Sequence, residues 1–217
     1  MSDYTGEVTP GGPAAVRELG DLTVTKVSVG AMDNNAYLLR CRHDGSQVLI
    51  DAANDASRLL EVIGPEGLTT VVTTHRHQDH WQALTEVVNA TGAASLAHAD
   101  DAAGIPVVTQ QLHEGDTVAV GDCTLEVIHI VGHTPGSIVL LYRDPSGTAH
   151  LWTGDSLFPG GPGRTTNPRD FASLMGDLES KVFGRLSDDT WFYPGHGRDS
   201  TLGKERPAIP EWRARGW

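Results

Sequence analysis

The stretch VVTTHRHQDHWQAL, residues 71–84, places three histidines and one aspartate within six residues, directly after a short apolar and β-branched run. The run VVTT (71–74) is typical of a strand that enters a core, so we expect the cluster to lie at the end of that strand. Side chains that carry function are often found at strand ends and in the loops that follow them. The cluster is therefore the first candidate for a functional site.

The spacing within this cluster excludes a helix. His75 and His77 are two residues apart, whereas neighbours on one helix face are three or four apart. In an extended or turning segment alternate residues share a side, so His75, His77 and Asp79 can point one way, with His80 turned in by the following loop. Imidazole and carboxylate are ligands of zinc and similar ions, and one four-coordinate site needs only three or four of them. A single short loop with this many donors favours two ions.

Composition narrows the function classes. The chain has 217 residues, 39% of them hydrophobic, which is enough to bury a sizeable core. A formal net charge of −12, without a local Lys/Arg cluster, disfavours nucleic acid and anionic membrane surfaces as partners. Cys41 and Cys123 form no CxxC motif, so neither a disulfide framework nor a thiolate metal site is indicated. With no basic start followed by an apolar run, we expect a cytoplasmic protein.

The rest of the chain alternates strand and helix patterns. Residues 1–20, rich in Gly and Pro, are expected to form a flexible arm. Hydrophobic periodicity predicts helices at 56–64, 81–92 and 170–184. Strands are predicted at 22–29, 36–41, 47–51, 69–75, 93–98, 117–120, 124–131, 137–143, 150–154 and 191–197. No low-complexity linker divides these elements, so we expect one mixed α/β layered domain over residues 21–217.

Three further candidate ligands follow β-like runs, each beside glycine. They are His133 in VGHTPGS, Asp155 in WTGDSLF and His196 in YPGHG. Glycine permits the sharp turn that a ligand loop needs at the end of a strand.

Taken in order, HxHxDH, GHTPGS, GDSLF and YPGHG resemble the motifs of the metallo-β-lactamase-fold hydrolases, and within them the glyoxalase II-like branch. The resemblance spans residues 22–207 and implies an α/β fold, the αββα four-layer sandwich. It implies a first metal ion at His75, His77 and His133. It implies a second ion at Asp79, His80 and His196, with Asp155 bridging both ions and a hydroxide between them as nucleophile. Asp79 and Asp155 are the carboxylates expected at the reaction centre.

Several other residues have a less direct place in this resemblance. Asp51 is expected behind the ligands or as a cap. Arg164 follows a loop of Gly and Pro residues, and it is expected either to brace this loop or to bind an anionic group of the substrate. Similar hydrolases often have Cys at the position of Pro162. Packing or surface roles are expected for Trp81, Trp152, His43, His98, His113, His129 and His150.

We therefore expect a hydrolase of an activated acyl bond, with a small-thiol thioester such as S-lactoylglutathione as the first candidate substrate. Two divalent transition-metal ions are expected, with zinc first and iron or manganese as alternatives. Glyoxalase II itself carries a C-terminal helical domain that holds much of the glutathione, whereas here only residues 197–217 follow His196. The alternatives are a lactonase or other ester hydrolase, a persulfide dioxygenase-like enzyme with one iron, and a β-lactamase.

Overall fold

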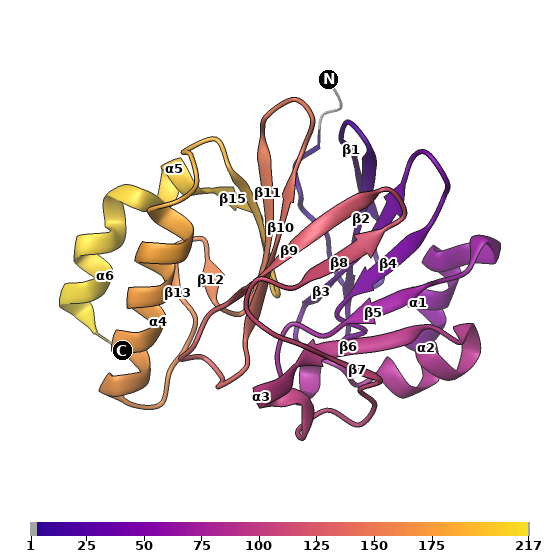
Figure 1. Ribbon diagram of the computed structural model, residues 1–217, viewed down its shortest axis with the longest axis horizontal. Coiled ribbons are helices and arrows are strands. Elements are labelled where there is room, and N and C mark those ends of the chain that lie inside the picture. The colour runs from indigo at the N-terminus through magenta and orange to yellow at the C-terminus, as the bar shows by residue number, and fades with distance from the viewer. Residues whose placement is uncertain (1–3, 217) are drawn as a thin grey trace.

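The computed structural model describes residues 4–216. Two sheets face each other at the centre of the molecule, and helices cover their outer faces (Figure 1). The first sheet has the order β1 (Ala15–Glu18), β2 (Leu22–Val29), β3 (Asn34–Cys41), β4 (Gln47–Ile50), β5 (Thr70–Val72), β6 (Ala94–His98) and β7 (Gln110–Leu112). Strands β1 to β4 are antiparallel, and β4 to β7 run parallel.

The second sheet is built from the C-terminal half of the chain. Its order is β15 (Ser200–Thr201), β14 (Trp191–Pro194), β11 (Ala149–Gly154), β10 (Ile138–Arg143), β9 (Cys123–His129) and β8 (Thr117–Val120). Only β11 and β14 pair in parallel here; the other pairs are antiparallel. A two-stranded ribbon, β12 (Leu157–Phe158) with β13 (Gly161–Pro162), follows β11.

Apolar side chains fill three layers between these elements. A central core, with Leu39 and Ile50 from the first sheet and Leu125 and Trp152 from the second, lies between the sheets. Helices α1 (Ala56–Ile63) and α2 (Leu84–Thr91) pack on the outer face of the first sheet. On the second sheet pack α4 (Pro168–Asp177), its π-helical continuation Leu178–Phe183, and α6 (Ile209–Arg215). The predicted αββα four-layer sandwich is therefore confirmed.

Parallel strands bring several loops to one edge. The carboxyl ends of β4, β5 and β6 are followed by Asp51, by the loop 73–80 and by the short helix α3 (Ala99–Ala102). The β9–β10 connection carries His133, and the ends of β11 and β14 are followed by Asp155 and His196. Because parallel neighbours end on the same side of a sheet, the topology gathers the candidate residues between the two sheets.

The helix predicted for residues 81–92 begins later, at Leu84. Residues Gln78–His80 form a 3₁₀ turn, and the amides of Gln82 and Ala83 donate to Ala53 O and Ala52 O. Leu84 N donates to Trp81 O at 3.0 Å, a 3₁₀-type bond, whereas a helix that began at Trp81 would need Leu84 N to donate to His80 O.

Of the segment 1–20 that was expected to be a flexible arm, residues 1–3 lie outside the described part of the chain, while Tyr4, Gly6 and strand β1 contact the rest of the fold. Strand β1 pairs with β2, and Tyr4 Oη donates to Asp199 Oδ2 at 2.8 Å. The buried Lys26 Nζ donates to Gly6 O at 2.7 Å, to Gly197 O at 2.8 Å and to Asp199 Oδ1 at 2.6 Å. Composition missed this contact because its partners lie far away in the sequence.

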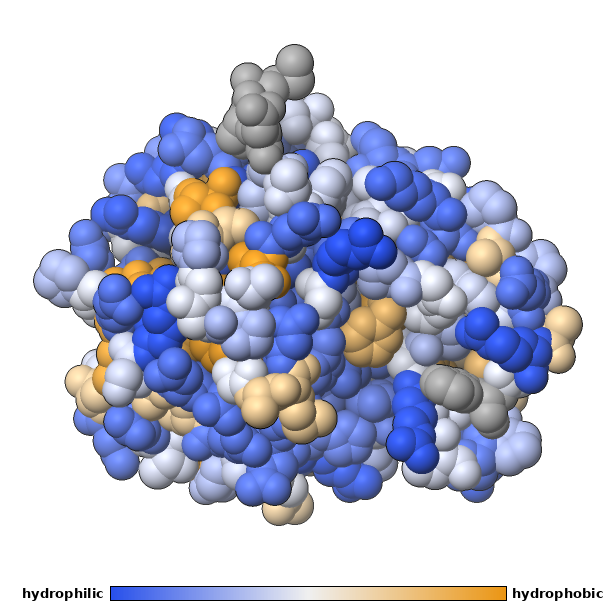
Figure 2. Space-filling view, turned by 180° about the vertical axis from the view of Figure 1, so that it is seen from behind, coloured by the Kyte–Doolittle hydropathy of each residue, from blue (hydrophilic) through white to orange (hydrophobic). Residues whose placement is uncertain are grey.

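The surface is mostly hydrophilic on the face seen from behind, and apolar residues occur there in small separate areas (Figure 2). Among residues 4–216, no helix is long and apolar enough to cross a membrane.

Candidate metal centre

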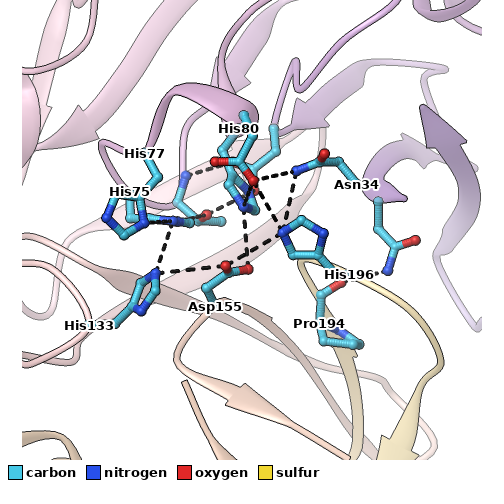
Figure 3. Close-up of polar contacts among 12 residues, drawn as sticks. Asn34, His75, His77, His80, His133, Asp155, Pro194 and His196 are labelled. Atoms are coloured by element: carbon cyan, nitrogen blue, oxygen red, sulfur yellow. Dashed lines mark hydrogen bonds and ion pairs between the residues drawn. The ribbon is translucent and has the colours of Figure 1, made fainter. Parts of the chain in front are cut away.

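The seven candidate ligands converge between the sheets (Figure 3). One set, which we call the first donor group, consists of His75, His77 and His133. The second donor group consists of Asp79, His80 and His196. Within each group the donor atoms lie within 4.8 Å of one another. Each group takes residues from the loop after β5 and one histidine from the second sheet, so each spans both sheets.

The first donor group has the spacing of a metal site. His75 Nε2 lies 3.1 Å from His77 Nδ1 and 3.3 Å from His133 Nε2. Ligands about 2.1 Å from a tetrahedral zinc ion stand roughly 3.4 Å from each other. The three rings meet edge to face, with centroids 4.6 to 4.8 Å apart, so their in-plane lone pairs can be directed at one point.

Asp155 lies between the two groups. Its Oδ2 is 3.7 Å from His133 Nε2 and 3.5 Å from His196 Nε2, and its Oδ1 is 3.3 Å from His80 Nε2. These distances suit two ligands of one ion better than direct hydrogen bonds. Among the described residues, His80 Nε2 and Asp155 Oδ1 are buried without a hydrogen-bond partner. Since buried polar atoms are nearly always paired, this pair fits a shared cation.

The second donor group completes the arrangement. Asp79 Oδ2 lies 3.5 Å from His80 Nε2 and 3.3 Å from His196 Nε2. It also accepts a hydrogen bond from Asn34 Nδ2 at 2.9 Å. Asn34, at the start of β3, was missed in the sequence because no local motif marks it.

The electrostatics of the two groups differ. Burial lowers the pKa of His75 well below its usual value, and burial likewise lowers the pKa of His77 and His133. These rings are therefore neutral near pH 7, as metal ligation requires. Burial also opposes the charged form of His80, but the carboxylates of Asp155 and Asp51 outweigh it and raise the His80 pKa well above its usual value. The site therefore favours positive charge beside Asp155.

Burial works against the ionised form of Asp155 too, but the neighbouring His80 lowers the pKa of Asp155 well below its usual value. Burial opposes a charged His196, yet its contact with Asp155 raises the pKa of His196. Positive charge on the histidines thus offsets the buried carboxylate, and a divalent ion could fill the same role.

Outer contacts aim the imidazole Nε2 atoms inward. His80 Nδ1 donates to Asp51 Oδ2 at 2.8 Å, His133 Nδ1 to Arg164 O at 2.7 Å, and His196 Nδ1 to Met32 O at 2.9 Å. Such partners fix the tautomer and the ring orientation of a ligand. Asp51 is itself buried, with φ of 59°, and accepts from Thr74 N and Oγ1 at 2.7 and 2.8 Å.

Tight packing leaves little room around Asp155. At Gly195, a Cβ atom would overlap Asp155 Oδ1 and lie 2.7 Å from His80 Cε1. Gly195, the first glycine of YPGHG, is therefore needed because its backbone lies directly against Asp155 and His80.

The side chain of Arg164 is exposed, whereas its carbonyl holds His133. The backbone of this residue thus serves as a brace, and a contact of its side chain with substrate remains a proposal.

The histidines expected to have other roles stay apart from this centre. His98 and His129 stack with centroids 3.8 Å apart and planes 25° apart. With Asp100 they form a further donor cluster, but nearly parallel rings do not direct their in-plane lone pairs at one point. His150 contacts Tyr193 Oη at 3.1 Å, and Trp152 stacks on Tyr193 in the central core.

Comparison with known proteins agrees with these motifs. The chain is 40% identical over 134 residues to a hydroxyacylglutathione hydrolase of Fuscovulum blasticum, which is 61% of this chain and 51% of that protein. It therefore spans about half the length of that relative. It is 28% identical over 211 residues to the hydroxyacylglutathione hydrolase GloC of Haemophilus influenzae, covering 87% of this chain and 97% of that protein. The predicted resemblance is confirmed.

Solved structures are similar as well. ETHE1 from Myxococcus xanthus matches with a TM-score of 0.77 and 27% identity, over 88% of this chain and 84% of that one. A protein solved in a di-iron-bound form matches with a TM-score of 0.69 and 29% identity, over 83% and 96% of the chains. The family model described as the metallo-beta-lactamase superfamily matches residues 29–196, which contain all seven candidate ligands. The chain belongs to the metallo-beta-lactamase superfamily.

Proposed function

We propose that this protein is a dinuclear metal-dependent hydrolase of an activated acyl bond, with a thioester of a small thiol as its substrate. The observation that carries the proposal is the position of Asp155, whose two carboxylate oxygens face His80 on one side and His133 and His196 on the other. Two donor groups that share one carboxylate favour two ions over one. The similarity to hydroxyacylglutathione hydrolases supports the thioester as substrate.

The proposal assigns a role to each residue of the centre. His75, His77 and His133 would hold one ion, Asp79, His80 and His196 the other, and Asp155 both. When bound, two such ions lower the pKa of a shared water and polarise a carbonyl. Asp51, Arg164 O and Met32 O keep the ligand imidazoles oriented before substrate arrives. Asn34 holds the Asp79 carboxylate in the same way.

The donor set of imidazole and carboxylate suits zinc, and it also suits iron or manganese. We propose zinc as the ion, and the di-iron form of a similar structure supports iron as the alternative. A cytoplasmic location and a free small-thiol thioester as substrate complete the proposal.

A second candidate is an oxidoreductase of the persulfide dioxygenase kind, with one iron, which the similarity to ETHE1 fits. That chemistry needs open positions on a single ion and gives His196 no part. The two functions therefore differ in what His196→Ala should do.

The test is to assay wild type and His196→Ala with a thioester under nitrogen and with glutathione persulfide in an oxygen electrode. We expect the wild type to hydrolyse the thioester without oxygen, and His196→Ala to lose this activity and one of two bound ions. His113→Ala, whose ring is exposed and pairs with Asp116, is the matched control and should keep both. Oxygen uptake that survives His196→Ala, without anaerobic thioester cleavage, would favour the dioxygenase.

A further inference from the structure

Asp101 is a buried carboxylate that touches both loops of the first donor group without being a ligand. It lies in α3, just beyond the carboxyl end of β6, and its side chain is fully enclosed. Its Oδ2 accepts from Arg76 N at 2.9 Å and from Thr134 Oγ1 at 2.5 Å. Its Oδ1 accepts from Gly136 N at 3.0 Å. We propose that Asp101 is a positioning residue that sets the distance between the two loops of the first donor group.

The donors to Asp101 sit beside the ligands. Arg76 stands between His75 and His77 on the loop after β5. Thr134 and Gly136 follow His133 in the β9–β10 connection of the other sheet. One carboxylate therefore joins two loops that belong to different sheets and that together supply the whole first donor group.

The contact between Asp101 and the His133 loop is close and well defined. At Gly136, a Cβ atom would lie 2.6 Å from Asp101 N and 2.9 Å from Asp101 Cγ, so the loop rests directly on α3. Thr134 Oγ1 is also 2.6 Å from Ser137 Oγ, which in turn accepts from Thr134 N at 3.2 Å. Because the Thr134 hydroxyl donates its hydrogen bond to Asp101, Thr134 Oγ1 must accept the hydrogen bond from the Ser137 hydroxyl. The orientation of both hydroxyl groups is therefore determined.

A buried charge of this kind is stable only when hydrogen bonds replace its lost hydration. Three hydrogen bonds from two loops do so here, and Arg76 Nε also lies 3.8 Å from Asp101 Oδ1. If either loop moved away, Asp101 would lose donors, so its charge opposes separation of His75 and His77 from His133.

The arrangement mirrors that of Asp51. Strand β5 lies between β4 and β6, and a buried acid follows each neighbour: Asp51 after β4 and Asp101 after β6. Asp51 contacts the ring of His80, a ligand of the second donor group, whereas Asp101 contacts the Arg76 amide, between His75 and His77, and the loop that carries His133. Asp51 also holds Thr74, whose Oγ1 lies 3.1 Å from His75 Nδ1, so it reaches both groups, whereas the Asp101 contacts are with the segments beside the ligands of the first group. This inference rests on the proposed function, because it concerns the ion that the first group would hold.

The test uses Asp101→Asn, which keeps the shape but replaces one accepting oxygen with an amide that donates. In a His196→Ala background, where the first donor group alone is complete, Asp101→Asn should weaken zinc binding by about 10- to 100-fold, the range typical for partners behind ligands. In a His77→Ala background, where only the second group is complete, it should leave zinc affinity unchanged. Competition with a chromophoric chelator measures both.

The matched control is Asp144→Asn. Asp144 is also buried and accepts backbone hydrogen bonds, from Gly20 N at 2.6 Å and Ser146 N at 2.8 Å, but it lies in the β10–β11 hairpin. Asp144→Asn should lower the thermal midpoint of unfolding without changing zinc affinity. Equal loss of zinc affinity in the two backgrounds, or none in His196→Ala, would overturn the proposal. If Asp101→Asn does not fold, Thr134→Val removes a single donor and should show the same selectivity.

Amide hydrogen exchange of the metal-free protein separates this inference from the proposed function. Arg76 and Gly136 amides should exchange faster in Asp101→Asn than in wild type or Asp144→Asn. Unchanged exchange at both amides would overturn the positioning role whether or not the chain binds metal. Absence of zinc binding by the wild type would instead overturn the proposed function.

Discussion

His80 Nε2 and Asp155 Oδ1 lie 3.3 Å apart in the interior, and neither atom has a hydrogen-bond partner among residues 4–216. The buried Asp155 carboxylate needs a positive charge beside it at this position, and either a proton on His80 or a bound ion can supply that charge. Substitution of either side chain should therefore have the largest effect on metal binding and hydrolysis.

Asp155→Ala should lower both metal content and thioester hydrolysis, because it removes the only carboxylate proposed to touch both ions. We expect a loss of activity beyond about 100-fold, the upper end for partners that lie behind ligands. Elemental analysis after reconstitution, together with steady-state rates, measures both effects. Two ions still bound at wild-type affinity would contradict the bridging role.

Asp51→Ala should be milder, since Asp51 acts on the ions only through His80 and Thr74. A loss of about 10- to 100-fold in activity is expected. The same assays apply to it. If Asp51→Ala and Asp155→Ala behaved alike, Asp155 would have no special place between the two donor groups.

Gly195→Ala should disturb the centre although it adds only a methyl group, because the new Cβ would overlap Asp155 Oδ1. We expect reduced metal affinity and activity. Gly176→Ala is the control: Gly176 lies in α4 with no neighbour within 4 Å of its would-be Cβ, and the change should stabilise the fold by up to about 1 kcal/mol. A fully active, metal-replete Gly195→Ala protein would show that the packing tolerates displacement of Asp155.

Removal of metal with a chelator should abolish hydrolysis and lower the thermal midpoint, because each ion would join the two sheets. A ligand present at about 100 times its dissociation constant stabilises the folded state by roughly 2.7 kcal/mol. Scanning calorimetry with and without zinc checks this. Identical midpoints under both conditions would argue that the donor groups do not bind the ion tightly.

His150 predicts a pH dependence of stability that is independent of the metal centre. Burial, followed by the charge of Arg17, lowers the pKa of His150 from 6.5 to about 4. Between these values the unfolded chain binds more protons than the folded one, so the free energy of unfolding should fall as pH drops from 6.5 toward 4. The contribution is on the order of 3 kcal/mol.

The geometry gives the reason. Arg17 Nη1 donates to Tyr193 Oη, which lies 3.1 Å from His150 Nδ1, so the guanidinium and the burial of the ring both disfavour a charged His150, and the Tyr193 hydroxyl can donate to the neutral ring. In His150→Asn the side-chain oxygen can accept the same bond without titrating. Urea unfolding of both proteins at pH 7.5 and pH 4.5 should show the smaller change in the variant. Equal changes would rule out His150 as the source.

The sequence predicted the fold where a pattern was local. Strand β2 occupies residues 22–29, as its alternation predicted, and α1 ends at Ile63, before Gly64. Strand β7 was missed because QQL has no alternation, and α6 because Pro207 and Pro210 suggest a break, although proline is well tolerated in a first helical turn.

The residues of the metal centre were likewise predictable only where a local sequence motif marked them. The seven candidate ligands stand in motifs that can be recognised in a single sequence, and the structure brings all of them together. Asn34, the carbonyl of Met32 and the side chain of Asp101 have no such signature. A backbone carbonyl looks the same in every residue, and a buried acid in DDA can be distinguished from its exposed neighbour Asp100 only after folding.

The contacts of Lys26 have a practical consequence for handling this protein. Its buried ammonium takes one acceptor from Gly6 and another from Gly197, which directly follows His196. A shortened protein that begins at β1 would lack Gly6, and Lys26 would then lose one of its hydrogen-bond acceptors. Its buried charge would be less well stabilised beside the loop that carries His196. A fusion partner is better joined at the other end, beyond α6, which lies on the outside of the second sheet and far from the N-terminal segment (Figure 1).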